Sequence, residues 1–121
     1  MILMTIALTR RSDITRAGFI AYWRDRHAPL VQELAPVLGI RRYVQIHSLS
    51  DEQLAAANVP AEAAGPYDGL AEVWFDSIAD ALERGRSLEA KAARNRLRED
   101  ELCFLQREAN LSWWGHAHAV L

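Results

Sequence analysis

The chain has 121 residues, about the size of one domain, and we predict a single domain spanning 1–121. Half of its residues are hydrophobic and a quarter are charged, which is typical of a folded globular protein and excludes a disordered tail. The net charge of −2 argues against a nucleic-acid-binding protein, because such proteins usually carry a basic excess.

A membrane-spanning or secreted protein is also disfavoured. The longest apolar stretch, residues 1–8, is far shorter than the roughly 20 residues that a bilayer span needs. Two arginines follow it and no cleavage site of small residues comes after them, so it does not resemble a signal peptide. The single cysteine, Cys103, excludes an intrachain disulfide, and we interpret it as a small buried hydrophobic residue. We therefore expect a cytoplasmic protein.

The first half of the chain predicts two strands with a helical segment between them. Residues 2–9 alternate in the manner of a strand, and Thr15 is a good N-cap for a helix that reaches about residue 27. Pro29 predicts a kink followed by a second helical piece, which Gly39 ends. Residues 40–49 alternate again and predict the second strand.

The second half repeats this order after a loop. Residues 50–66 predict a loop with one short helix near 51–57, and loops of this length often carry function, for example as a lid. A third strand is predicted over 69–75, followed by a helix that Asp76 or Ser77 caps and that continues to about residue 98, with a break near 85–87. Residues 111–121 predict the last strand.

Two β-α-β units in this length indicate an α+β, ferredoxin-like fold, in which helices cover one face of a four-stranded antiparallel sheet. The second, uncovered face is then expected to carry aromatic and polar side chains from three strands. A large patch of this kind usually marks an interaction surface. We predict a homodimer in which two sheets meet and enclose a cavity for a small molecule. The residues expected on this face are Tyr43, Gln45, His47, Glu72, Trp74, Trp114 and His116.

Three segments of the chain resemble the EthD-domain family, in the family's order. Residues 22–30 read YWRDRHAPL, residues 41–47 read RRYVQIH, and residues 67–77 read YDGLAEVWFDS. The resemblance extends over nearly the whole chain and implies membership of the dimeric α+β barrel superfamily. Proteins of similar fold include muconolactone isomerases, polyketide cyclases and dehydratases, quinol-forming monooxygenases without a cofactor, and haem-binding enzymes. Because EthD-domain dehydratases work without a metal or organic cofactor, the resemblance implies none here.

Two histidines and a tyrosine are the first candidates for catalysis. His27 is predicted at a helix end, whose exposed carbonyl groups favour a protonated ring and suit a general acid, although simple capping of the helix explains it equally well. His47 suits a general base, with Tyr43 donating a hydrogen bond to the developing oxyanion. The alternative for His47 is a histidine satisfied at the dimer interface.

The remaining candidates come from the other strands and the first helix. Glu72 could orient a histidine or act as a base, but pairing with Arg42 or Arg107 is at least as good an interpretation. We expect Trp23, Gln45, Trp74, Trp114 and His116 to contact the substrate, although the tryptophans at positions 23 and 74 are packing residues first.

A metal site is the weaker alternative. His116 and His118 could hold one metal from the same strand face, completed by His47 or Glu72, but this spacing alone is a weak signal near a chain end. We predict no metal and no organic cofactor.

The leading functional hypothesis is acid/base catalysis on a small aromatic polyketide-like or lactone compound, by dehydration, cyclisation or isomerisation. A second hypothesis is a monooxygenase that acts on a phenol without a cofactor. A third is a dimer that binds a ligand without catalysis, and haem binding is a weaker fourth.

Overall fold

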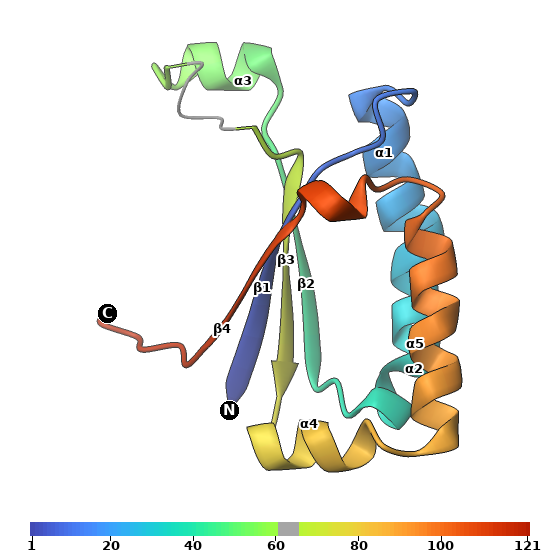
Figure 1. Cartoon of the computed structure of the whole chain (residues 1–121). Coiled ribbons are helices and arrows are strands. Elements are labelled where there is room, and N and C mark those ends of the chain that lie inside the picture. The colour runs from blue at the N-terminus through green and yellow to red at the C-terminus, as the bar shows by residue number, and fades with distance from the viewer. Residues whose placement is uncertain (61–65) are drawn as a thin grey trace.

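A computed structural model describes residues 1–60 and 66–121 of the chain and shows one four-stranded antiparallel sheet. The strands lie in the order β2-β3-β1-β4, with helices packed on one face (Figure 1). The predicted ferredoxin-like α+β fold is therefore confirmed. The strands are β1 (Ile2–Leu8), β2 (Arg42–His47), β3 (Gly69–Phe75) and β4 (Leu111–Gly115).

The helical layer consists mainly of α1, α2 and α5, which run along the sheet, while α4 crosses one end of it (Figure 1). The short helix α3 lies near the opposite end of the sheet. No helix among the described residues is long and apolar enough to cross a membrane. The helices are α1 (Arg16–Tyr22), α2 (Ala28–Leu38), α3 (Asp51–Ala56), α4 (Ile78–Arg84) and α5 (Leu88–Glu101), with a π-helical turn η1 (Trp23–His27) and a 3₁₀ turn η3 (Arg107–Ala109).

Most of the local start and stop signals act as predicted. Thr15 accepts a hydrogen bond from the Gly18 N–H at the start of α1, and Ser77 caps α4 in the same way. A break at residues 85–87 separates α4 from α5. The predicted short helix is present as α3, but the lid suggested for residues 50–66 includes residues 61–65, which lie outside the described part of the chain.

The chain does not end a helix at His27, contrary to our prediction. Backbone angles stay right-handed helical from α1 through η1 into α2, and the Ala28 N–H donates to the Trp23 carbonyl, five residues back. Pro29 has no N–H to donate, so one helical bond is lost here, and the wider π turn just before it keeps the helix continuous. His27 therefore lies inside a long helical run, and its surroundings differ from those of a helix end.

Three further expectations need correction. The last strand ends at Gly115, so His116 and His118 lie beyond the sheet and are exposed. Cys103 is exposed rather than buried, because it follows the last turn of α5 and faces solvent. Residues 48 and 49 leave the second strand early, since Ser48 turns to donate to the Asp68 carbonyl.

The face assigned to β2 is the main error of the sequence interpretation. Tyr43 pairs with Val73 and Gln45 pairs with Ala71, and both partners on β3 are buried under the helices. Because directly paired residues point to the same face of a sheet, Tyr43, Gln45 and His47 lie under the helices and not on the uncovered face. Trp114 pairs with Met4 and also lies on the covered side.

The uncovered face is more apolar than we predicted. Glu72 and Trp74 lie on it, as expected, because they alternate with the four buried residues of β3. Two aliphatic residues of β2, Val44 and Ile46, lie there too, because they pair with Glu72 and Leu70 of β3. The open face consists of Leu3, Thr5, Ala7, Arg42, Val44, Ile46, Leu70, Glu72, Trp74, Leu111 and Trp113.

The tightest packing lies under α1 and η1. Phe19, Trp23 and Phe104 are fully buried, and the ring centroids of Phe19 and Trp23 are 5.5 Å apart. Gly69 lets Trp23 approach the sheet, because a Cβ at this position would lie only 2.6 Å from a carbon of the Trp23 ring. This cluster holds η1, and with it His27, against the sheet.

Candidate functional site

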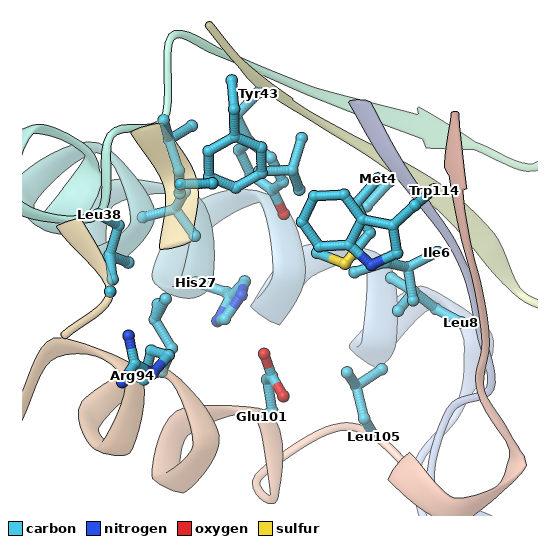
Figure 2. Close-up of a pocket in the computed structure, with 18 of the residues that line it drawn as sticks. Met4, Ile6, Leu8, His27, Leu38, Tyr43, Arg94, Glu101, Leu105 and Trp114 are labelled. Carbon is cyan, nitrogen blue, oxygen red and sulfur yellow. The ribbon is translucent and has the colours of Figure 1, made fainter. Parts of the chain in front are cut away.

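A cavity of about 570 Å³ lies between the sheet and the helical layer. Its walls are largely apolar, and the polar side chains on them are few, which is typical of a small-molecule site. In Figure 2, Arg94 and Leu38 lie toward one end, and Ile6, Leu8 and Trp114 lie toward the other. The charged or polar groups that line the cavity are His27, Tyr43, Arg86, Arg94 and Glu101.

His27 lies in the cavity wall with one ring nitrogen engaged. Only 6% of the residue is exposed, and its Nδ1 lies 2.7 Å from Oδ2 of Asp100, on the last turn of α5. The other carboxylate oxygen accepts a 2.6 Å hydrogen bond from the Tyr22 hydroxyl. With Asp100 as acceptor, the Nδ1 of His27 carries the proton, so Nε2 is the atom left to exchange a proton with a ligand.

The bond to Asp100 raises the pKa of the Tyr22 hydroxyl, and burial raises it further. Tyr22 therefore remains a donor to Asp100 at neutral pH. Because Tyr22 and His27 both donate to it, the carboxylate of Asp100 is held in one orientation, and so is the imidazole.

Tyr43 presents its hydroxyl to the same cavity. Oη accepts hydrogen bonds from Trp23 Nε1 at 3.0 Å and from Gln45 Nε2 at 3.3 Å. Burial raises the pKa of the Tyr43 hydroxyl, while these two donors act in the opposite direction. Since both lone pairs of the oxygen are used, the hydroxyl proton is available to donate to a ligand.

Gln45 and His47 lie next to Tyr43 and Trp23 but do not line the cavity. Gln45 donates from Nε2 to the Trp23 carbonyl at 2.9 Å, which fixes its amide so that Oε1 accepts from His47 Nε2 at 2.8 Å. The His47 ring packs against Trp23 with centroids 5.0 Å apart, and neither Gln45 nor His47 lines the cavity. Burial and the nearby Arg24 lower the pKa of His47. His47 is thus not brought to the ligand space that His27 and Tyr43 share.

The candidates on the open face are also separated from the cavity. Glu72 accepts a 3.3 Å hydrogen bond from Trp74 Nε1, and Arg42 stacks over the Trp74 ring. Among the described residues, Glu72 forms an ion pair with neither of the arginines considered for it, and Arg107 pairs instead with Glu101 at 2.8 Å. Glu72 and Trp74 cannot act on a ligand beside His27, because the sheet lies between.

Of the remaining expected contacts, Trp23 and Trp114 line the cavity and His116 does not. Trp114 stacks on Phe75 with centroids 5.6 Å apart, and forms part of the apolar end (Figure 2). Within residues 1–60 and 66–121, no three histidine, cysteine, aspartate or glutamate side chains gather as metal ligands.

The model of the EthD domain matches residues 11–108 of the chain. The chain belongs to the EthD family. No curated protein matches it.

Solved structures show the same fold at low sequence identity. An EthD family protein from Bacillus halodurans C-125 is 18% identical with a TM-score of 0.60, and the match covers 98% of this chain and 100% of that one. A dimeric ferredoxin-like protein of unknown function from Thermobifida fusca YX is 13% identical with a TM-score of 0.57, covering 96% and 90%. A protein from Nitrosomonas europaea, provisionally named an antibiotic biosynthesis monooxygenase, is 13% identical with a TM-score of 0.54, covering 98% and 100%.

Four residues of the site in this EthD-family chain were missed in the sequence analysis: Arg86, Arg94, Asp100 and Glu101. Asp100 and Glu101 belong to an acidic run that looks like a solvated helix end, and nothing local connects Asp100 with His27, 73 residues earlier. The position of Glu101 could have been predicted from the sequence. It lies four residues after Leu97, so both residues are on the inward side of α5. Arg94 lies on the same helix and Arg86 lies in the connection before it, and the charge of both residues suggested only exposure to solvent.

Proposed function

We propose that this cavity is the active site of an acid/base enzyme that moves a proton on a small, aromatic, carbonyl-bearing compound without an organic cofactor. The outcome would be a dehydration, a cyclisation or an isomerisation. The observation that supports it most is the His27–Asp100 pair at the wall of a largely apolar cavity. A histidine oriented in this way can act first as a base and then as an acid.

In the proposed reaction, Nε2 of His27 removes a proton from the carbon next to the substrate carbonyl. The C–H electron pair moves into the carbonyl group and forms an enolate, whose oxygen accepts a hydrogen bond from Tyr43. His27 then returns the proton, either to another carbon in an isomerisation or to a departing hydroxyl group, which leaves as water. The apolar walls limit access of bulk water and strengthen both interactions.

We also propose that the protein is a homodimer joined through its open face. Trp113 is 76% exposed and Ile46 is 46% exposed on this face, and leaving such side chains in water is unfavourable. The similar Thermobifida fusca protein is dimeric, which supports the proposal. Glu72 and Trp74 would then belong to the interface between subunits and not to the catalytic cavity.

The decisive experiment measures proton removal directly. Candidate aromatic ketones are incubated with the protein in D₂O, and exchange at the carbon next to the carbonyl is followed by NMR. We expect His27→Asn to slow exchange by about 10²-fold or more, because the base is lost. The matched control is His47→Asn, which removes a histidine outside the cavity and should retain most of the exchange rate. Equal rates for His27→Asn and the wild type would disprove the proposal.

A monooxygenase is the second candidate, favoured by the aromatic cavity wall of Trp114 and Phe75 and by the fold of the Nitrosomonas europaea protein. Oxygen uptake during turnover of an electron-rich phenol would support it. Tight binding of such compounds with neither exchange nor oxygen uptake would indicate a ligand-binding protein instead.

A further inference from the structure

The cavity has one charged end, which the proposed reaction does not use. Arg94, on α5, and Arg86, in the α4–α5 connection, both line this space, whose other walls are mainly apolar. In Figure 2 the Arg94 side chain lies at the end of the cavity opposite Trp114, with His27 and Glu101 between the two ends. Both arginines are exposed to solvent, so they form a charged rim of the cavity.

These two guanidinium groups are not neutralised by neighbours. Of the ion pairs formed within residues 1–60 and 66–121, none involves Arg86 or Arg94. Glu101 is the acidic residue on the cavity wall, and its carboxylate is held by Arg107 at 2.8 Å. The cavity rim therefore carries positive charge that an anionic group could satisfy.

The backbone leaves room for the Arg94 head group. A Cβ on Gly85 would come within 3.2 Å of Arg94 Nη1, so the guanidinium packs closely over this glycine at the end of α4. Arg94 thus lies at a defined place beside the cavity. A guanidinium group binds a carboxylate through two parallel hydrogen bonds.

We infer that the aromatic, carbonyl-bearing substrate of the proposed reaction also has a carboxylate, which binds Arg94 and Arg86 while the flat ring system extends toward Trp114. This inference rests on the proposed function, because it takes the cavity as the substrate site. It orients the ligand, since the part of the molecule between the carboxylate and the far end of the ring system then lies beside His27 (Figure 2). Neutral aromatic ketones would be weaker ligands than acids of the same size.

The test compares 2-naphthoate with 2-naphthamide, which has the same shape but no charge, by isothermal titration at neutral pH. We expect the acid to bind at least about tenfold more tightly. Arg94→Gln should remove most of this preference and the Arg86→Gln/Arg94→Gln double variant all of it, while binding of the amide stays unchanged. The matched control is Lys91→Gln, which removes a positive charge from the exposed side of the same helix.

Several outcomes would overturn the inference. Equal affinity for acid and amide, no binding of the acid, or the same loss in Lys91→Gln as in Arg94→Gln would each contradict an anion site. Decanoate binding as tightly as 2-naphthoate would contradict the aromatic ring system. His27→Asn should keep the preference for the acid, so failure of catalysis and failure of the anion site give different results.

Discussion

The two faces of the sheet differ in what their polar groups do. On the covered face, Tyr43 and His27 are held by hydrogen bonds to Trp23 and Asp100 and line a cavity. On the open face, Glu72 has one bond to its strand neighbour Trp74, and the surface around it is largely apolar. Aromatic and acidic side chains occur on both faces, but only the covered face combines them with an enclosed space. Residue type alone therefore does not mark the site.

The largest loss of stability is expected from a side chain introduced at Gly69, where the sheet contacts the Trp23 ring. Gly69→Val should destabilise the fold by about 3 kcal/mol, because its side chain would collide with the fully buried Trp23 ring. Chemical denaturation followed by tryptophan fluorescence measures this change. An unfolding midpoint equal to that of the wild type would show that the close contact at Gly69 does not contribute to stability.

Replacement of one acidic residue in each region tests which region contributes to activity. Asp100→Asn should lower deuterium exchange by at least about tenfold, because an amide no longer holds His27 with its proton on Nδ1. Glu72→Gln, on the open face, should leave exchange within about twofold, since it contacts no part of the cavity. Similar losses in both variants would mean that the faces are not functionally distinct.

A charge introduced on each face distinguishes the two regions by its effect on the oligomeric state and on folding. Ile46→Asp should weaken the proposed dimer by about 1–3 kcal/mol while the monomer stays folded, because an unpaired carboxylate would be buried in the proposed interface. Analytical ultracentrifugation with circular dichroism measures both properties. The control, Val73→Asp on the covered face, should unfold the protein instead. A stable wild-type monomer at micromolar concentration would contradict the dimer.

The sequence alone was sufficient for the order of elements, the ferredoxin-like fold and the family. Helix caps, glycine and proline positions, and alternating strand patterns each depend on a few neighbouring residues. They can therefore be recognised without knowledge of tertiary contacts. The candidate site was only partly predictable. Four of the predicted site residues line the cavity: Trp23, His27, Tyr43 and Trp114. The prediction placed the candidates of β2 and β4 on the uncovered face of the sheet, whereas Tyr43 and Trp114 lie on the covered face.

Only the tertiary structure decided which face is covered and which acid meets His27. An alternating strand divides its side chains into two sets, but the pattern does not say which set the helices cover. In β2 the helices cover the more polar set, because Trp23 supplies a donor for Tyr43 and an acceptor for Gln45. Asp100 reaches His27 because α5 packs beside η1, a contact between distant parts of the chain that no local pattern encodes.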